Sequence, residues 1–433
     1  MANFLISTMP ESGHVNPALP VAAALVRRGH SVLWHSGLGA RRAIESTGAT
    51  FIAFEQTPDF VQVPVRPDDG ATGIAAGVSV MRRLFIDRVP GQVADYQRIL
   101  ERFPVDVILA DMTSFGAATL HDLGGPPFAT LGIIPLTTLD PEIPPWGSGR
   151  QVARSSGDRF RNRVAHWMAR QLFLPKVTAL LNRERTKLGL STLPGATQFT
   201  DLQRSPFLHL MPTTPAFEYP RQRLAPQINF VGPLVPEPSA DFELPVWWGD
   251  MNGRTVVHVT QGTYATEAAS LIQPTIAALA ESNVLVVVTT RQAERLGALP
   301  PNVRVAPFIP HSLLLPKAHA MITNGGYNGV LTALAHGVPL VCAGQSEDKA
   351  EVSARVGWSG AGIDLRTSTP SEQQVARAVA RILSEPSFRQ NAQRIAADFA
   401  LHDGPNEAAG LLERLAASGE PVLRREGVTE AVR

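Results

Sequence analysis

Short apolar runs alternate with helical patterns twice along the chain, and this alternation constrains the fold more than any other feature. In the first half the runs lie at residues 4–6, 32–34, 51–54, 107–110 and 128–131, and in the second half at 256–259, 284–288, 303–306, 321–323 and 340–342. Runs that are apolar at successive positions are typical of parallel strands covered by helices on both faces. The sequence therefore predicts an α/β protein with two doubly wound, Rossmann-like domains that face each other across a cleft.

The chain divides into four expected segments. We expect an N-terminal domain at residues 1–235, a proline-rich linker at 236–250, a second domain at 251–410, and a C-terminal helix or tail at 411–433. Within the first domain, residues 137–204 have no strand pattern, and 159–188 indicate a helical insert. In the second, Thr369-Pro370-Ser371-Glu372 predicts a helix start with Pro370 at the first helical position.

Composition excludes several function classes. The chain has 39 Lys+Arg against 38 Asp+Glu, a net charge of +1, so no overall field favours nucleic acid. Cys342 is the one cysteine of the sequence, so we expect no internal disulfide, no cysteine zinc site and a cytoplasmic location. No run approaches about 18 apolar residues, and the first residues do not have the pattern of a secretion signal. We therefore expect no membrane span.

The first motif with chemical potential is Ser12-Gly13-His14-Val15-Asn16-Pro17, directly after the first predicted strand. We expect Asn16 to cap a helix and Pro17 to be its first residue. Asp111 follows the strand at 107–110, so it lies at the same sheet edge as His14. A histidine oriented by a carboxylate can act as a general base. A loop histidine bonded to backbone and a helix-capping aspartate are the structural alternatives.

Two glycine-containing loops follow strands in the second half of the chain. They are Thr323-Asn324-Gly325-Gly326-Tyr327-Asn328-Gly329, which leads into a helix, and Gln261-Gly262-Thr263. Glycine lets backbone N–H groups approach a phosphate, and a helix N-terminus attracts its charge. One such loop would be read as a structural turn, but two in one domain favour a diphosphate site. The dinucleotide G-x-G-x-x-G, the P-loop, the G-x-S-x-G elbow and the H-E-x-x-H pair do not occur.

Together these motifs resemble those of the family 1 glycosyltransferases, which have the GT-B fold. The segment 307–315 is similar to W-x-P-Q-x-x-x-L, and the glycine loop with 333–339 is similar to H-x-G-x-x-[ST]-x-x-E-A-L-x-x-G-x-P. Glu347-Asp348-Lys349 corresponds to a terminal D-Q pair. The similarity is greatest to bacterial enzymes that glycosylate macrolides, phenolics and other natural products.

This resemblance implies an inverting sugar transfer from a UDP- or dTDP-sugar to a hydroxyl of a small hydrophobic acceptor, such as a phenolic, polyketide or macrolide aglycone. It implies that His14 is the base, that Asp111 orients it, and that no prosthetic group or metal takes part. The first domain would bind the acceptor and the second the nucleotide sugar, in a monomer or homodimer. The implied donor-site residues are Gly13, Gly262, Thr263, Phe308, Ile309, His311, Asn324, Gly325, Gly326, Asn328, Gly329, Thr332, Glu347, Asp348 and Lys349. Acceptor-lining candidates are Phe60, Met81, Phe85 and Trp146.

Four positions depart from the family pattern. Asn324 stands where the family has a histidine, and Thr332 stands where it has the ribose-binding glutamate. Lys349 stands in place of the glutamine of the D-Q pair, and His311 stands in place of another glutamine. Without the ribose glutamate, a deoxyribose donor (dTDP) becomes a reasonable hypothesis. Two other functions stay open: a GT-B nucleotide-sugar epimerase, and a catalytically silent, glycosyltransferase-like regulatory partner.

Overall fold

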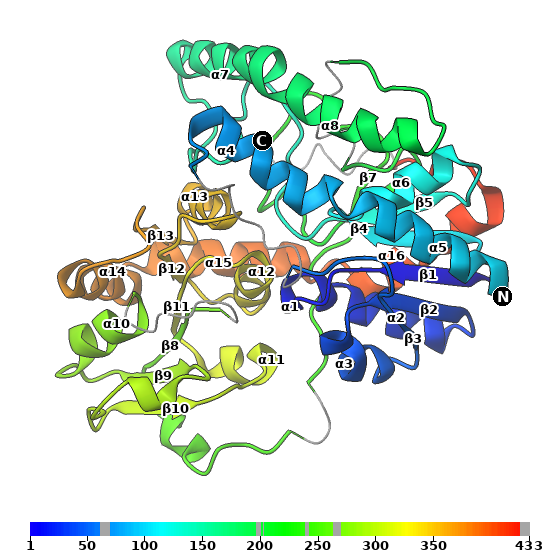
Figure 1. Ribbon diagram of the computed structural model, residues 1–433. Coiled ribbons are helices and arrows are strands. Elements are labelled where there is room, and N and C mark those ends of the chain that lie inside the picture. The colour runs from blue at the N-terminus through cyan, green and yellow to red at the C-terminus, as the bar shows by residue number, and fades with distance from the viewer. Residues whose placement is uncertain (61–69, 196–200, 202, 239–241, 263–269, 425–433) are drawn as a thin grey trace.

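Two parallel β-sheets organise the chain (Figure 1). The computed structural model describes residues 1–60, 70–195, 201, 203–238, 242–262 and 270–424. The first sheet has the strand order β3-β2-β1-β4-β5-β6-β7, and the second has the order β10-β9-β8-β11-β12-β13. Within the described residues every paired strand is parallel to its neighbour. The α/β, doubly wound architecture predicted from the apolar runs is confirmed.

The first sheet is covered by helices on both faces. Its strands are β1 (Asn3–Ser7), β2 (Ser31–Ser36), β3 (Thr50–Ala53), β4 (Val107–Asp111), β5 (Phe128–Leu131), β6 (Leu208–Met211) and β7 (Ile228–Phe230). Side chains of α2 (Ala18–Arg27) and α3 (Arg41–Glu45) share one core with the sheet, and α5 (Val89–Arg102) and α6 (Phe115–Asp122) share another. The shorter elements are α1 (Ser12–Val15), η1 (Leu38–Ala40), α4 (Gly73–Met81) and the π-turn η2 (Arg82–Ile86).

Strands β6 and β7 were not predicted from the sequence. His209 interrupts the apolar run of β6, and Asn229 interrupts that of β7, yet both side chains are buried. His258 interrupts the predicted strand β8 (Val256–Thr260) in the same way, so one buried polar residue does not by itself explain why β6 and β7 were missed.

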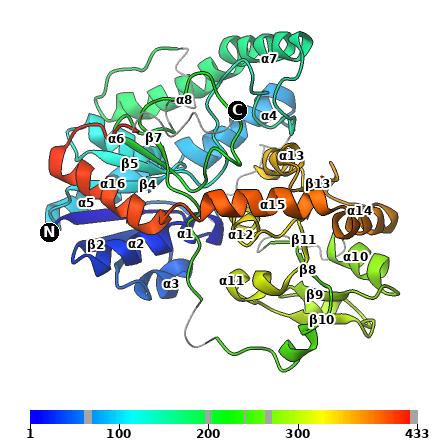
Figure 2. The ribbon, with the colours of Figure 1, turned by 180° about the vertical axis from the view of Figure 1, so that it is seen from behind.

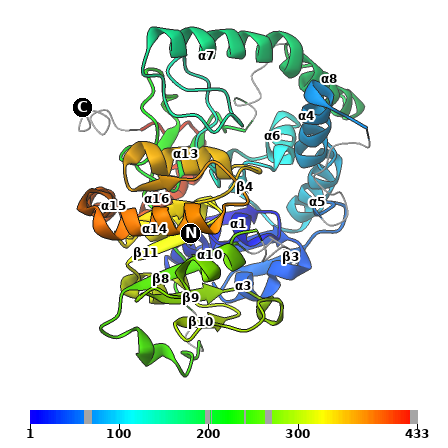
Figure 3. The same cartoon turned by 90° about the vertical axis from the view of Figure 1, so that its left-hand side faces the viewer.

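The expected helical insert is present as an extended arm. It comprises α7 (Ser156–Met168), a π-helical turn η3 (Ala169–Phe173) and α8 (Leu174–Lys187). Ser155 starts α7 in a capping box with Asp158. Figure 3 shows this arm at the top of the molecule, above α13 (Lys349–Ser359).

The second sheet has the same layered arrangement. Its strands are β8 (Val256–Thr260), β9 (Leu285–Thr289), β10 (Val303–Ala306), β11 (Ala320–Thr323), β12 (Leu340–Cys342) and β13 (Gly362–Asp364). The cores of its two faces contain α10 (Ile272–Leu279) and α14 (Glu372–Ser384), and α12 (Tyr327–Ala335) and α13, respectively. The remaining short turns are η4 (Trp248–Met251), η5 (Ala293–Arg295), α11 (His311–Leu314) and η6 (Leu315–Lys317).

Two details of this half differ from expectation. The three-residue strand β13 was not predicted, because it begins with a glycine; a Cβ on Gly362 would lie 2.2 Å from the carbonyl oxygen of Leu340. Helix α14 begins at Glu372 with Ser371 as its cap, two residues later than predicted. Gln374, rather than Glu372, completes the capping box, so its side chain satisfies the Ser371 N–H.

The last two helices join the halves of the molecule. α15 (Pro386–Phe399) packs on the second sheet, and α16 (Gly404–Ser418) returns to pack on α2 and the first sheet. Figure 2 shows them crossing the back of the molecule almost in line. The boundary expected after residue 410 falls inside α16. Within the described residues, none of these helices has the length and hydrophobicity needed to span a bilayer.

Candidate active site

His14 and Asp111 lie together at the carboxyl ends of two neighbouring strands. β1 and β4 pair in the centre of the first sheet, Asp111 is the last residue of β4, and the segment after β1 leads to His14. The motif forms its own helical turn, α1, in which Asn16 is the C-cap; Pro17 then precedes α2. The expected roles of Asn16 as an N-cap and of Pro17 as a first helical residue are therefore wrong, because a separate turn carries His14.

Hydrogen bonds fix the Asp111 carboxylate. Its Oδ2 lies 2.8 Å from Nδ1 of His14 and accepts the Met9 N–H at 3.0 Å. Its Oδ1 accepts the Thr113 N–H at 2.8 Å and the Thr113 hydroxyl at 2.5 Å. Burial would raise the pKa of Asp111, but the charge and hydrogen bond of His14 and these other donors lower it overall. Asp111 is thus an ionised, acceptor-only partner.

This carboxylate determines what His14 can do. Burial would lower the pKa of His14, but the charge and hydrogen bond of Asp111 raise it overall. Because an ionised carboxylate only accepts, Nδ1 of His14 carries the hydrogen, and Nε2 of the neutral ring keeps its lone pair. The His14 side chain retains 14% of its exposure. The geometry therefore suits proton abstraction by Nε2.

Two residues near His14 complete its surroundings. Phe60 packs edge-on against the imidazole with ring centroids 5.5 Å apart, so this acceptor candidate lies beside His14. Glu11, which sequence analysis did not single out, precedes α1 and interacts electrostatically with His14. Burial raises the pKa of the Glu11 carboxyl. Its position three residues before His14 was the sequence signal from which Glu11 could have been identified as a neighbour of His14.

The two glycine loops meet at the carboxyl ends of adjacent strands β8 and β11. Asn324 joins them: its Nδ2 donates to the carbonyl oxygen of Gln261 at 2.6 Å, and its Oδ1 accepts the Gly326 N–H at 3.4 Å. Gly262 and Gly325 have φ angles of +78° and +85°, which favour glycine. Thr263 lies outside the described residues. Asn324 thus holds together the backbone that was expected to receive a diphosphate.

Helix α12 brings the second domain into contact with the first. Asn328, in its first turn, donates from Nδ2 to the carbonyl oxygen of Gly13 at 3.0 Å. One turn later, the Thr332 hydroxyl donates to the Asn328 carbonyl oxygen at 2.7 Å. Gly329 faces His311, since a Cβ there would lie 3.6 Å from its Cε1 atom. The N-terminus of α12 therefore lies next to the His14 turn.

Two of the expected donor-site residues are an exposed aromatic ring and a neutral imidazole. Phe308 is 60% exposed, with its ring edge-on to that of Phe242, whereas Ile309 is buried. His311 Nε2 lies 3.4 Å from Nε2 of His258, and burial lowers the pKa of His311 to about 4. The surface of Phe308 is thus free to stack on a planar group.

The Glu347-Asp348-Lys349 segment leads into α13. Burial raises the pKa of Asp348 to about 6, and Asp348 interacts electrostatically with His14 from the other domain. The Lys349 ammonium forms an ion pair with Glu347, which has a φ of +56°. The cation that replaces the family's glutamine is therefore paired within its own segment.

The remaining acceptor candidates differ in how deeply they are buried. Trp146 is 38% exposed, and Met81 is partly buried against the α5–α6 core. Phe85 is 3% exposed and packs 4.8 Å from the ring of Phe115 in that core. The expectation that Phe85 lines the acceptor site is corrected, because its helical spacing reflects core packing.

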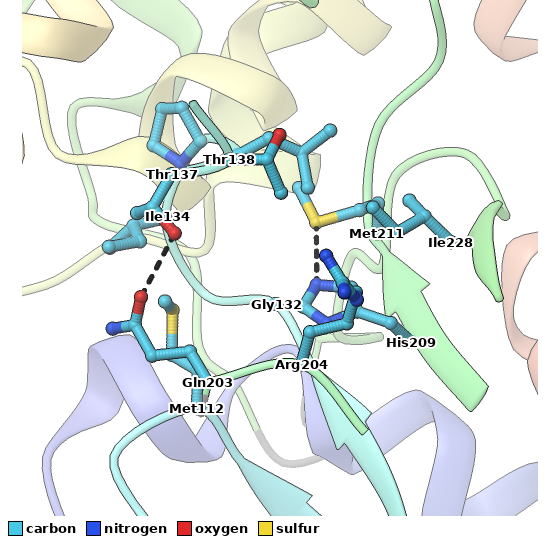
Figure 4. Close-up of a pocket in the computed structure, with 12 residues that line it drawn as sticks. Met112, Gly132, Ile134, Thr137, Thr138, Gln203, Arg204, His209, Met211 and Ile228 are labelled. Atoms are coloured by element: carbon cyan, nitrogen blue, oxygen red, sulfur yellow. Dashed lines mark hydrogen bonds between the residues drawn. The ribbon is translucent and has the colours of Figure 1, made fainter. Parts of the chain in front are cut away.

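A small cavity lies at the carboxyl ends of β5 and β6 (Figure 4). Its lining includes Met112, next to Asp111, and the buried His209, whose Nε2 is 3.2 Å from the sulfur of Met211. Burial lowers the pKa of His209 to about 3, so this imidazole is neutral. With a volume of about 10 Å³, the cavity has room for one water molecule and not for a sugar.

Comparisons with known proteins agree with this arrangement. Residues 273–415 match the family described as "Erythromycin biosynthesis protein CIII-like, C-terminal domain". The chain is 42% identical over 420 residues to 4'-demethylrebeccamycin synthase of Lentzea aerocolonigenes, covering 96% of this chain and 99% of that protein. It is 30% identical over 450 residues to UDP-glycosyltransferase 2 of Phaeomoniella chlamydospora, covering 96% of each.

A solved structure shares the fold. The spinosyn rhamnosyltransferase SpnG complexed with thymidine diphosphate superimposes with a TM-score of 0.69 at 20% identity, over 95% of this chain and all of that chain. The two Rossmann-like sheets thus form the GT-B fold, and the relatives named for sugar transfer extend over nearly the whole chain. The protein belongs to the GT-B glycosyltransferases of the natural-product type and is a sugar-transferring enzyme.

Proposed function

We propose that the protein transfers a sugar, with inversion, from a UDP- or dTDP-sugar to a hydroxyl of a small hydrophobic acceptor. The observation that carries this proposal is the 2.8 Å contact between His14 and the buried Asp111, beside the N-terminus of α12. An oriented imidazole with a free Nε2 matches the need to remove a proton from a weakly acidic hydroxyl.

The reaction is a single displacement. Nε2 of His14 takes the proton of the acceptor hydroxyl while that oxygen forms a bond to the anomeric carbon. The bond from this carbon to the diphosphate oxygen breaks, and its electron pair leaves with the nucleoside diphosphate. Attack opposite the leaving group inverts the anomeric centre, and Asp111 stabilises the imidazolium that forms.

The leaving diphosphate needs stabilisation as its charge develops. We assign this role to backbone N–H groups of the Gly325-Gly326 turn and to the N-terminus of α12, a helix of nine residues. Asn324 supports this assignment because it fixes the turn against the neighbouring loop. The Asn328 amide has two hydrogens on Nδ2 and donates one of them to Gly13, so the other can be donated to the diphosphate.

For the nucleotide, we favour dTDP over UDP. Thr332 stands where a ribose-binding glutamate is usual, and its hydroxyl is engaged by the Asn328 carbonyl. A deoxyribose lacks the 2′-hydroxyl that a carboxylate would bind, so replacing the glutamate by threonine costs a deoxyribose nucleotide less binding free energy than it costs a ribose nucleotide. The SpnG structure with thymidine diphosphate supports this preference by analogy, whereas the fungal relative named a UDP-glycosyltransferase supports UDP.

The proposal is tested first by ligand binding. A thermal-shift titration with UDP, dTDP, GDP and NAD, with and without EDTA, measures stabilisation of the full chain. A ligand at 100 times its dissociation constant stabilises by about 2.7 kcal/mol. We expect a shift with dTDP and UDP that survives EDTA and is larger for dTDP. No shift with either pyrimidine diphosphate would contradict a donor site here.

Product analysis then separates the functions left open by the sequence. Mass spectrometry after incubation with a dTDP-sugar and a panel of phenolic and macrolide aglycones is expected to show a glycoside. An altered nucleotide sugar formed without acceptor would indicate the epimerase. Nucleotide binding without any product from the panel would favour the regulatory partner. Light scattering distinguishes a monomer from a homodimer.

A further inference from the structure

A buried ion pair joins the two domains next to the proposed site. Glu218 follows β6 of the first sheet, and Arg355 lies on α13 of the second domain. Oε1 of Glu218 accepts a hydrogen bond from Nε of Arg355 at 2.8 Å, and Nη2 of Arg355 lies 2.8 Å from the same oxygen in an ion pair. This oxygen also accepts the backbone N–H of Tyr219 at 2.8 Å and a hydrogen bond from Nη1 of Arg221 at 3.2 Å. All three charged side chains are at most 2% exposed.

The first domain holds this pair through its backbone. Oε2 of Glu218 accepts the N–H of Leu136 at 2.9 Å, and Nη2 of Arg221 donates to the Leu136 carbonyl at 2.8 Å. The guanidinium of Arg355 also lies 4.1 Å from the centre of the Tyr219 ring. Burial would raise the pKa of Glu218, but Arg355 and Arg221 lower it overall, so the carboxylate is ionised.

A second carboxylate extends the contacts to the loop that carries Trp146. Glu351 Oε1 accepts the N–H of Gly149 at 3.0 Å, and Arg355 Nη1 donates to the Glu351 carbonyl oxygen at 3.1 Å. Arg355 and Glu351 also form an ion pair at 3.5 Å. We call Glu218, Arg221, Glu351 and Arg355 the interdomain ion network. It contains two charges of each sign.

The network lies between the two proposed substrate sites. α13 begins directly after Asp348, so Arg355 is two turns, or about 10 Å, along the helix from this expected donor-site residue. Gly149 is three residues from Trp146 on the acceptor side. Figure 3 shows α13 between the second sheet and the loops below α7. Any shift of the network therefore moves donor and acceptor elements relative to each other.

Burying four ionised side chains is not the most stabilising way to join two surfaces. Desolvation offsets most of the attraction, and apolar residues of similar volume are often as stabilising or more so. Ionic contacts, unlike apolar ones, permit few relative orientations. The arrangement therefore defines one geometry rather than maximising stability.

We propose that the interdomain ion network positions α13 so that the anomeric carbon meets the acceptor hydroxyl and not water. This inference rests on the proposed function. In the competing hydrolysis, a water oxygen bonds to the anomeric carbon and gives up a proton to Nε2 of His14, while the bond to the diphosphate oxygen breaks and its electron pair leaves with the nucleoside diphosphate. The products are free sugar and nucleoside diphosphate. A loosened network misplaces the acceptor and admits water.

The test compares Arg355→Met with Arg185→Met in the full-length protein. Arg185, whose own side chain is 7% exposed, forms an ion pair with the partly exposed Asp122, at 2.5 Å, within the first domain and away from α13. Glycoside and free sugar are quantified together by mass spectrometry, with separate kcat and KM values for donor and acceptor. Circular dichroism confirms that each variant is folded at the assay temperature.

For Arg355→Met we expect transfer kcat/KM to fall by about 10²-fold, as for a misplacement of about 1 Å. The ratio of free sugar to glycoside should rise, and the thermal shift with nucleotide should persist. Arg185→Met should lower the melting temperature without changing that ratio, and Arg355→Lys should restore part of the transfer. A folded Arg355→Met that keeps the wild-type ratio would overturn the inference.

A milder variant keeps the proposal testable if Arg355→Met does not fold. Glu351→Gln retains an oxygen for the Gly149 N–H but removes the charge facing Arg355. Glu351→Gln should raise the ratio of free sugar to glycoside by a smaller factor than Arg355→Met does, and an unchanged ratio would contradict the inference. Failure of the proposed function is distinguishable, because the wild-type protein would then form no glycoside at all.

Discussion

Replacing Asp111 by asparagine tests the proposed base most directly. The carboxylate receives five donors: His14 and Met9 at Oδ2, and the Thr113 N–H and the Thr113 and Ser114 hydroxyls at Oδ1. An asparagine offers an oxygen to one side and an NH₂ group to the other. With the NH₂ at the Oδ2 position, Nδ1 of His14 must become the acceptor, and its hydrogen moves to Nε2. This orientation sets the NH₂ against one other donor, the Met9 N–H, whereas the reverse orientation sets it against the Thr113 N–H and the Thr113 and Ser114 hydroxyls.

The size of the loss follows from this change of tautomer. With hydrogen on Nε2, the ring has no lone pair for the acceptor hydroxyl, so general-base assistance worth about 10²–10⁴-fold is lost. At 1.36 kcal/mol per factor of ten, this corresponds to about 2.7–5.4 kcal/mol in the activation barrier. Because the Asp111 charge raises the pKa of His14, the variant should also have a lower His14 pKa.

The assay is transfer kcat/KM between pH 5 and 9 for wild-type protein, Asp111→Asn and Asp106→Asn. Asp106 precedes the same strand at its opposite end, where it accepts the Asn3 N–H at 2.7 Å, so it is a matched control without contact to His14. We expect a loss of 10²-fold or more and an acid limb at lower pH for Asp111→Asn alone. Activity within a few-fold of wild type, with an unmoved acid limb, would refute the assigned roles.

Three further predictions concern the same site. His14→Ala should lower transfer by at least about 100-fold while the thermal shift with dTDP remains, and retention of turnover within a few-fold would show that another group is the base. In the wild-type protein, kcat/KM should fall as the pH drops through the pKa of His14, because protonation removes the base. Since this pKa is raised, the midpoint of the fall should lie above pH 6.5, and initial rates measured across pH locate it. Phe308→Ala should weaken nucleotide affinity by about tenfold or more through loss of base stacking, with little change in melting temperature since the ring is 60% exposed. Calorimetric titration measures that affinity, and an unchanged dissociation constant would place the nucleobase elsewhere.

Local sequence determined most of the architecture and the members of the proposed base pair. A strand covered on both faces must be apolar at successive positions, so the central strands of both sheets are visible as runs. The carboxyl ends of parallel strands share one edge, and the positions of His14 and Asp111 after two such runs therefore indicated their proximity. Their 2.8 Å contact agrees with that expectation.

Tertiary structure alone decided the features that depend on distant partners. The short strands β6 and β7 are defined by their pairing with β5 and with each other, and Phe85 has the same periodicity whether it packs in a core or lines a pocket. Glu218 and Arg355 are 137 positions apart, and in sequence each is an ordinary charged residue. Burial and ion pairing are properties of the space between two domains, which the chain defines only once both sheets have formed and α15 and α16 have joined them.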